Sequence, residues 1–224
     1  MASLHRFPMK STLGESLGAL DVDERGVVGD RIWSIRTREN KIGSGKSTRR
    51  FAAVPGLLRV RARTTDAGVR ITLPTGEELL TQDPLTGPAL SGLLGRPVTV
   101  ACESNVSHFD DGPVSLLGAA SVAALAAEVG AEVDASRFRA NILIEGLQPF
   151  AEDSLVGQCL RIGDVLLEVT MRSPRCVMID METADLPSQP GNLVTVGRLN
   201  NACLGVVARV AAPGRVRVGD ALLA

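Results

Sequence analysis

The cysteine most suited to chemistry in this chain is Cys176, which lies in the stretch Ser-Pro-Arg-Cys-Val-Met-Ile-Asp between a Pro-Arg turn and a short apolar run. Free cysteine commonly behaves as a small buried hydrophobe, and this is the expectation for Cys102, Cys159 and Cys203. Cys176 differs, because the neighbouring guanidinium of Arg175 favours the thiolate, which attacks electrophiles and binds soft metals. The sequence leaves both packing and chemistry open for Cys176.

Basic residues recur beside turns along the whole chain. A single charged residue at a strand end is usually solvated. Several together could line the site of an anionic ligand such as a phosphate, because Arg offers a planar fork for two hydrogen bonds and Lys a point charge. The candidates from these turns are Lys10, Ser11, Arg31, Arg137, Arg139 and Arg175.

The stretch Gly-Ser-Gly-Lys-Ser-Thr at 43–48 resembles the end of a phosphate-binding P-loop. The signature is incomplete, because its first glycine would fall on Asn40. The chain also reaches Pro55 too soon for the helix that a P-loop requires. We expect a basic surface loop instead, followed by the pair Arg49-Arg50.

Other common catalytic and metal-binding patterns are missing from the sequence. The two histidines, His5 and His108, do not combine with any cysteine pair in a zinc-site spacing, so a structural zinc is not expected. The nucleophile motif Gly-x-Ser-x-Gly does not occur, so nothing supports an acyl-transfer triad.

Composition indicates a globular protein of the cytoplasm. The chain has 224 residues, 45% of them hydrophobic, and a formal net charge of −1, so no global field would gather nucleic acid or an anionic membrane. Its four cysteines lie far apart, as expected in a reducing compartment. No signal peptide opens the chain and no apolar run approaches the roughly 20 residues of a membrane-spanning helix.

Short runs rich in Val, Ile and Leu, divided by Gly and Pro turns, predict a mainly β protein. The expected strands are 31–36, 58–64, 69–73, 98–102, 141–145 and 160–171. Hairpins are expected at the turns 74–76, 163–164 and 213–214, where glycine supplies a positive φ.

Two segments predict short helices. The first is 88–94, closed by Gly95, and the second is 122–129, with Ser121 as N-cap and Gly130 after its end. The Ala-rich second helix is expected to pack against or cover a barrel. Residues 1–97 and 98–224 are the predicted domains, and N-terminal strands could join the C-terminal barrel.

Six segments, in order, resemble motifs of the MOSC family, named after the C-terminal domain of molybdenum-cofactor sulfurase. The resemblance is strongest to its two-part members akin to the amidoxime-reducing components. Phe-Pro-Met-Lys-Ser at 7–11 is similar to the family's Tyr-Pro-Val-Lys-Ser, and Gly-Asp-Arg-Ile-Trp at 29–33 to its Gly-Asp-Arg-x-Trp. The other segments are 110–116, 137–141 (Arg-Phe-Arg-Ala-Asn), 149–153 and the cysteine motif 174–176.

The resemblance implies an antiparallel β-barrel with a smaller N-terminal β-region and a few short helices, and a cofactor of the molybdopterin type. It places Lys10, Ser11, Arg31 and one residue of the Arg49-Arg50 pair at the cofactor's phosphate. Ser115, Arg139 and Asn141 would lie on the pterin side, with Arg137 and Arg175 beside these motifs. Cys176 would bind molybdenum or carry a persulfide.

The resemblance implies a molybdenum-dependent oxidoreductase that reduces N-oxygenated small molecules. No cysteine cluster for an iron–sulfur centre occurs, so electrons are expected from a separate ferredoxin or flavin reductase. Ala140 replaces the usual Pro, and the Thr-rich run of the amidoxime reducers is missing after Cys176, which leaves the substrate class open. The alternatives are a persulfide sulfur carrier that works with a cysteine desulfurase, and a non-catalytic cofactor-binding module.

Overall fold

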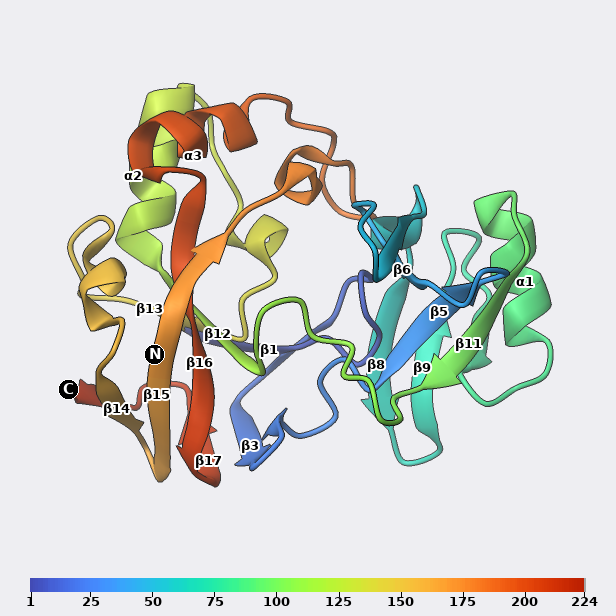
Figure 1. Ribbon diagram of the computed structural model, residues 1–224, viewed down its shortest axis with the longest axis horizontal. Coiled ribbons are helices and arrows are strands. Elements are labelled where there is room, and N and C mark those ends of the chain that lie inside the picture. Colours follow the sequence, from blue (N-terminus) through green and yellow to red (C-terminus); the bar gives the residue numbers. More distant parts are fainter. Residues whose placement is uncertain (224) are drawn as a thin grey trace.

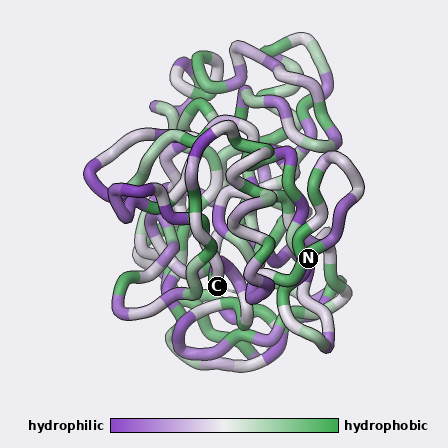
Figure 2. The backbone as a smooth tube through the Cα atoms, turned by 90° about the vertical axis from the view of Figure 1, so that its right-hand side faces the viewer, coloured by the Kyte–Doolittle hydropathy of each residue, from purple (hydrophilic) through white to green (hydrophobic). Residues whose placement is uncertain are grey.

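The computed structural model describes residues 1–223 and is built mainly of β-strands, as the sequence predicts. Figure 1 shows a larger part around strands β15 (Val165–Pro174) and β16 (Cys203–Ala212), with two helices above it, and a smaller β-rich part beside it. The two chain ends lie close together in Figures 1 and 2. The Met1 ammonium donates to the Asp220 carbonyl at 2.7 Å, which ties these ends.

The larger part is a curled, mostly antiparallel sheet of eight strands, in the order β18-β14-β15-β16-β12-β13-β1-β2. Apolar residues alternate with polar ones along its strands, so one face is buried, as in the Val165, Leu167 and Val169 series of β15. The bounds are β1 Ser3–Arg6, β2 Glu15–Leu17, β12 Val114–Gly118, β13 Ile142–Ile144, β14 Cys159–Ile162, β15 Val165–Pro174, β16 Cys203–Ala212 and β18 Leu222–Leu223.

The smaller part consists of a four-stranded sheet, β11-β5-β6-β7, and a three-stranded sheet, β10-β9-β8. They share a core with helix α1, around Ile35, Ile71 and Leu90. The bounds are β5 Trp33–Thr37, β6 Ile42–Ser44, β7 Phe51–Ala53, β8 Arg61–Thr65, β9 Gly68–Thr72, β10 Glu78–Leu80, β11 Val98–Cys102 and α1 Thr86–Leu94, with the 3₁₀ turn η1 Leu57–Arg59. A further sheet, β17-β3-β4, contains β3 Ala19–Asp23, β4 Gly26–Val27 and β17 Gly214–Arg217.

Helices α2 (Ala119–Val129) and α3 (Asn192–Asn200) share a third core, which includes Leu125 and Val196. Both lie at the top of the large sheet in Figure 1. The short turns η2 Ala135–Phe138, η3 Ala151–Leu155 and η4 Val177–Asp180 connect this region to the strands. No helix of the part that the structure describes is long and apolar enough to cross a lipid bilayer.

The expected strands and both expected helices form, except that residues 58–59 belong to the 3₁₀ turn η1; two other local predictions are wrong, and one helix is missed. The N-cap of α2 is Gly118 and not Ser121, whose hydroxyl instead donates to the buried Glu152 carboxylate at 2.7 Å. The turn 213–214 forms no hairpin, because β17 pairs with β3 and Gly214 packs against Asp164. The sequence does not predict helix α3, which is less apolar than α1 and α2.

Residues 7–13, which we call the crossing segment, connect β1 and β2 of the large sheet and on the way bridge to Trp33 and Arg61 of the smaller part, so they form the seam between the two parts. The Arg31 N–H donates to the Phe7 carbonyl at 2.7 Å, and the Lys10 N–H donates to the Trp33 carbonyl at 2.8 Å. The buried Asp30 carboxylate accepts the Phe7 N–H at 2.7 Å. These bonds fix where the side chains of the motif at 7–11 point.

Gly118 is expected to tolerate no side chain, although its φ of −76° is ordinary. A Cβ there would lie 2.7 Å from the Glu152 carboxylate, so Gly118→Ala should destabilise the protein by about 1–3 kcal/mol. Gly92, inside α1, has nothing within 4 Å of such a Cβ, and Gly92→Ala should stabilise by about 0.5–1 kcal/mol. Urea unfolding of both variants measures the difference, and equal shifts would contradict this packing.

Candidate functional site

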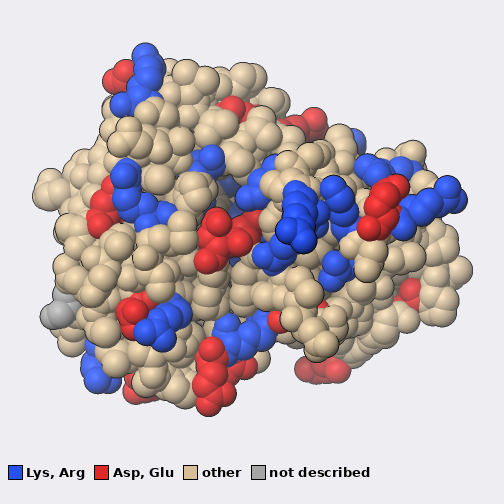
Figure 3. Space-filling view, viewed as in Figure 1, with Lys and Arg blue, Asp and Glu red and all other residues tan. Residues whose placement is uncertain are grey.

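A cleft lies at the seam, with about 770 Å³ of space including the solvent at its mouth. Its walls come from separate parts of the chain: the crossing segment with Lys10, the 110–115 stretch before β12, the turn η2, and the end of β15 with Cys176. In Figure 3 the hollow lies between the two parts, with basic side chains along its rim. A cleft of this size can admit a small molecule or cofactor.

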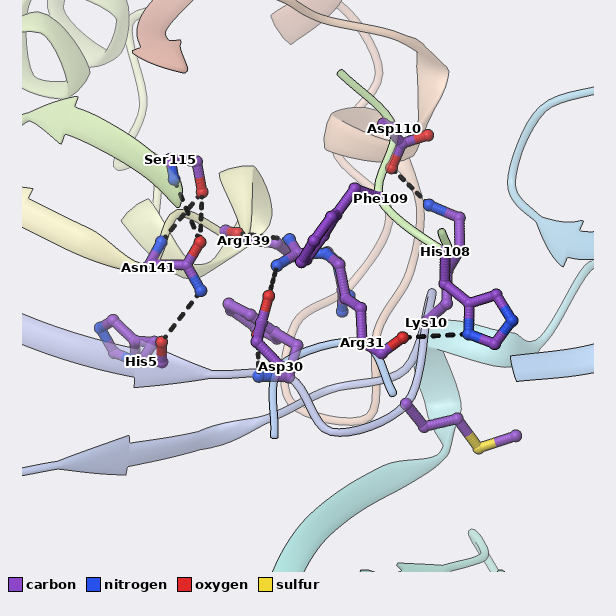
Figure 4. Close-up of polar contacts among 12 residues, drawn as sticks. His5, Lys10, Asp30, Arg31, His108, Phe109, Asp110, Ser115, Arg139 and Asn141 are labelled. Atoms are coloured by element: carbon purple, nitrogen blue, oxygen red, sulfur yellow. Dashed lines mark hydrogen bonds and ion pairs between the residues drawn. The ribbon is translucent and has the colours of Figure 1, made fainter. Parts of the chain in front are cut away.

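Eight of the eleven site residues expected from the sequence line this cleft: Lys10, Ser11, Arg31, Ser115, Arg137, Arg139, Arg175 and Cys176. Asn141 lies directly behind Ser115, whose hydroxyl donates to the Asn141 side-chain oxygen at 2.9 Å (Figure 4). Arg49 and Arg50 lie outside the lining. Arg49 is exposed, and the Arg50 guanidinium donates to the carbonyls of Ser107 and Phe109.

Three residues of the lining have left-handed backbone conformations that non-glycine residues rarely adopt. The φ angles are 62° at Ser11, 53° at Arg31 and 52° at Arg139. Such conformations persist only where the surrounding structure holds them, and they concentrate at functional sites. Here the main-chain bonds of the seam and the turn η2 hold the three side chains in the cleft.

Lys10 is buried, and its ammonium donates to the Asp110 carboxylate at 2.6 Å (Figure 4). Burial lowers the pKa of Lys10 to about 8, although Asp110 opposes the shift. Lys46 reaches the other oxygen of the same carboxylate at 3.2 Å. Burial alone would raise the pKa of Asp110, but Lys10 and Lys46 outweigh it and hold the pKa well below its usual range.

Arg139 is almost completely buried and has little anionic compensation. Its guanidinium lies 4.4 Å from the centre of the Phe7 ring. Burial and then the like charge of Arg31 lower the pKa of Arg139 to about 9. Arg31 binds Asp30 and the Arg139 carbonyl. Among the residues described, the Arg139 Nη1 has no hydrogen-bond partner.

Arg175 and Cys176 follow each other at the end of β15. The Arg175 guanidinium donates to the Leu204 carbonyl at 2.7 Å and to the Phe138 carbonyl at 3.0 Å. Burial lowers the pKa of Arg175 to about 10, and the nearby Cys176 sulfur opposes this shift. Cys176 is half-buried and precedes η4, so its sulfur belongs to a wall of the cleft.

The expectation of burial is wrong for the other three cysteines. Cys102 and Cys159 are exposed and Cys203 is half-buried. Cys159 begins β14 on the face opposite to the buried Leu160 and Ile162, whereas Cys102 shares the face of Val98 and Val100 but is exposed as the last residue of β11. None of the three lines the cleft around Cys176.

Sequence reasoning missed Lys46, Asp110 and Met178 in the cleft wall. Lys46 belongs to the Gly-Ser-Gly-Lys-Ser-Thr stretch, which the structure folds as the end of β6 and a loop to β7, without the helix of a P-loop. Gly45 allows close contact here, because a Cβ would lie 2.3 Å from the Met178 side chain. The basic loop therefore reaches the cleft, which its composition alone did not indicate.

His108 fixes the backbone of Arg31 from outside the cleft. Its Nδ1 lies 3.0 Å from the Arg31 carbonyl, and its Nε2 lies 3.1 Å from the Ser34 hydroxyl and 3.2 Å from the Arg36 guanidinium (Figure 4 shows the first contact). Since an arginine can only donate, Nε2 accepts and the proton is on Nδ1. Burial lowers the pKa of His108 to about 4.

The lowered pKa of His108 should appear in the pH dependence of stability. Between pH 6.5 and about 4 the unfolded chain binds a proton on this ring that the folded protein does not bind. The free energy of unfolding should therefore fall by roughly 3 kcal/mol as the pH falls through this window. His108→Asn keeps a donor for Arg31 without titrating. Urea unfolding across the window should show a shallower loss in this variant, and equal slopes would contradict the assignment.

Comparison with known proteins gives two family matches that together span most of the chain. The MOSC N-terminal beta barrel domain matches residues 1–88, and the MOSC domain matches residues 103–223. In the solved structures, YuaD from Bacillus subtilis has the same fold, with a TM-score of 0.53 at 15% identity over 98% of this chain and 91% of that one.

Curated relatives match shorter segments. A molybdenum cofactor sulfurase of Caenorhabditis briggsae is 33% identical over 108 residues, which is 47% of this chain and 15% of that protein. The mitochondrial amidoxime-reducing component 1 of Homo sapiens is 35% identical over 80 residues, 36% of this chain and 23% of that protein. The chain thus covers a minor part of each relative. With a MOSC domain over more than half of its length, behind the family's N-terminal domain, the chain belongs to the MOSC family, which is linked to the molybdenum cofactor.

Proposed function

We propose that the cleft binds a molybdenum cofactor and that the protein reduces N-oxygenated small molecules. The observation that carries the proposal is the excess of buried cationic groups over carboxylates beside a half-buried cysteine. Lys10, Arg139 and Arg175 all have pKa values lowered by burial, so each would gain from an anionic partner. Asp110 already interacts with two lysines, and the Arg139 Nη1 has no partner among residues 1–223.

The donor set fits the chemistry of this cofactor. A phosphate accepts hydrogen bonds from cationic groups, and unpartnered buried donors are expensive unless a ligand satisfies them. Lys10, Ser11 and Arg31 would hold the phosphate. Ser115, with Asn141 behind it, and Arg139 would hold the pterin side. The thiolate of Cys176 is a soft ligand that suits molybdenum.

When bound, the cofactor supplies a metal that accepts an oxygen atom and cycles between oxidation states. For an N-hydroxylated substrate the balance is R–NHOH + 2 e⁻ + 2 H⁺ → R–NH₂ + H₂O. The two electrons come from a separate redox protein, and the protons enter from solvent at the open mouth of the cleft. The residues of this chain bind and orient, because their strained backbones fix the side chains before any ligand arrives.

Cys176 also supports a second function, in sulfur transfer. Three of the curated relatives that share a segment with this chain bear the name molybdenum cofactor sulfurase. In this alternative, a persulfide of a cysteine desulfurase loses its outer sulfur as its S–S bond breaks, and the Cys176 thiolate forms a new S–S bond. Cyanide-releasable sulfur on the purified protein would favour this function. Reversible cofactor uptake without turnover would favour a binding module.

We expect the charge of Lys10 to contribute to cofactor binding and not to the stability of the fold. Lys10→Met keeps the volume of the side chain and removes a charge-assisted contact worth about 1.5–3 kcal/mol, so affinity for the cofactor should fall tenfold or more. The free energy of unfolding should change little, because relief of the desolvated ammonium offsets the loss of its ion pair with Asp110, which keeps Lys46 as a partner. Molybdenum content, pterin fluorescence and urea unfolding measure both effects on protein from a cofactor-competent host.

The charge of Lys10 also predicts a pH dependence. Because the pKa of Lys10 is about 8, inorganic phosphate should bind more weakly as the pH rises past 8, and this loss should be smaller in Lys10→Met. A folded wild-type protein that takes up neither molybdenum nor pterin would contradict the proposal. If the Lys10→Met variant bound the cofactor with unchanged affinity, Lys10 would not be one of the residues that hold it.

Cys176 is expected to be required for turnover but not for anchoring the cofactor. Cys176→Ser replaces a soft ligand with a hard, weakly acidic one, so reduction of benzamidoxime should be lost while phosphate-anchored cofactor remains. Cys102→Ser and Cys159→Ser are matched controls on exposed positions, and both should keep activity and stability. Full turnover by Cys176→Ser, or loss of turnover in a folded control, would show that the reactive thiol is misassigned.

A further inference from the structure

A second basic feature lies outside the cleft, at one end of the four-stranded sheet. Residues 31–50 contain seven basic residues and one acidic residue, although the whole chain has a net charge of −1. We call the surface members of this group, with one residue before β11, the basic ridge. It consists of Arg36, Arg38, Lys41, Arg49, Arg50 and Arg96.

The strand directions bring these residues together. The end of β5, the start of β6 and the start of β11 share one sheet end, because β5 is antiparallel to both neighbours. β7 runs parallel to β6, so its start lies there too. Arg36 pairs with Ile42 across the strands, and the Ile42 N–H donates to the Arg50 carbonyl at 3.2 Å. Burial and the charge of Arg50 lower the pKa of Arg36, as expected for adjacent cations.

The ridge differs from the rest of the surface in its lack of ion pairs within the described residues. The exposed Glu39 lies nearby, and its pKa is lowered first by hydrogen bonds to Thr37 and its own backbone and then by the charges of Arg96 and Arg38. Elsewhere most basic surface residues form ion pairs, such as Arg25 with Glu103 and Arg209 with Glu168. Over residues 1–223, none of the six ridge residues forms an ion pair. Several donate to main-chain carbonyls instead, as Lys41 does to Thr48 at 3.1 Å and Arg96 to Ala53 at 3.2 Å. These bonds hold the cations in place without neutralising their charge.

The ridge is continuous with the mouth of the cleft. Arg50 donates to the carbonyls of Ser107 and Phe109, directly before Asp110 in the cleft wall. Lys46, in the connection between β6 and β7, lies in the same wall. Figure 3 shows this gathering of Lys and Arg atoms on the smaller part, next to the hollow. A protein seated on the ridge would therefore lie beside the cleft.

We propose that the basic ridge is the docking surface for a small acidic protein that carries one electron, for which a [2Fe–2S] ferredoxin serves as the probe. This inference rests on the proposed function, which requires two electrons per product. Each ferredoxin is oxidised by one electron, so two encounters complete one turnover. Fixed, unpaired cations attract a partner of opposite charge, speed the encounter and orient it. Short-lived electron-transfer complexes are suited to such small polar contacts.

The side chains of the ridge favour a protein over nucleic acid. Binding of single strands uses exposed aromatic rings on which bases stack. Here Phe51 is buried beneath Lys10, Lys46 and Arg50, so it cannot stack on a base. Arg38 and Arg49 are exposed and available to surface carboxylates of a partner.

The test reverses charge on the ridge and on a matched control surface. The variant Arg38→Glu/Arg49→Glu changes two exposed ridge residues that lie outside the cleft lining. The control Arg161→Glu/Arg217→Glu makes the same charge change on exposed residues of β14 and β17. Calorimetric titration with an acidic [2Fe–2S] ferredoxin at low and high salt, and reduction of benzamidoxime by reduced ferredoxin or by reduced methyl viologen, are measured for each.

The ridge variant should bind ferredoxin at least about tenfold more weakly, with a reduced salt dependence, and lose ferredoxin-driven turnover in proportion. Its turnover with methyl viologen should match the wild type, and the control should bind as the wild type does. The proposal is overturned by absence of saturable ferredoxin binding to the wild type, by an equal loss in the control, or by tighter binding of a short duplex DNA. Intact ferredoxin binding without turnover by either reductant would contradict the proposed function and leave the docking surface standing.

Discussion

Main-chain carbonyl groups, more than carboxylates, are the partners of the arginines in and around the cleft. The Arg175 guanidinium is held by the carbonyls of Leu204 and Phe138, and that of Arg137 by those of Met181 and Pro187. A carbonyl dipole satisfies the geometry of an N–H donor but leaves the formal charge in place. The side chains are therefore fixed and remain cationic. An anionic ligand can then bind without first displacing a counterion from each arginine.

This constraint also explains why the cleft lies at the seam. Carbonyls free to accept from side chains occur where strands end or irregular segments begin, because ladder carbonyls within a sheet are already bonded. The crossing segment 7–13, the turn η2 and the end of β15 are such places, and all three meet between the large sheet and the smaller part. The three hydrophobic cores lie behind these segments and hold them rigidly.

Much of the fold and of the site could be predicted from the sequence, because strand periodicity and the order of the motifs are local properties. The strand at 98–102 forms with the predicted bounds, and helix α1 ends at Gly95, which has φ 64°. The features that could not be predicted depend on how distant parts of the chain pack together. The turn at 213–214 leads to a distant partner strand, and Cys102 is exposed although it shares a strand face with the buried Val98, because the core does not extend to the end of β11. Lys46 enters the cleft only because Gly45 lets the loop approach Met178.

The same arrangement of the cleft lowers the stability of the fold. Burying Lys10 and Arg139 disfavours their charged forms, and the left-handed backbones of Ser11, Arg31 and Arg139 add strain. Neither the buried charges nor the left-handed backbones improve packing, since apolar residues in ordinary conformations could fill this space. Desolvated charge and fixed orientation do, however, strengthen the binding of an anion, because less reorganisation is needed when it arrives. Strain and desolvation at the same few residues therefore destabilise the fold but preorganise the cleft for an anion. The three surrounding hydrophobic cores supply the stability that offsets them.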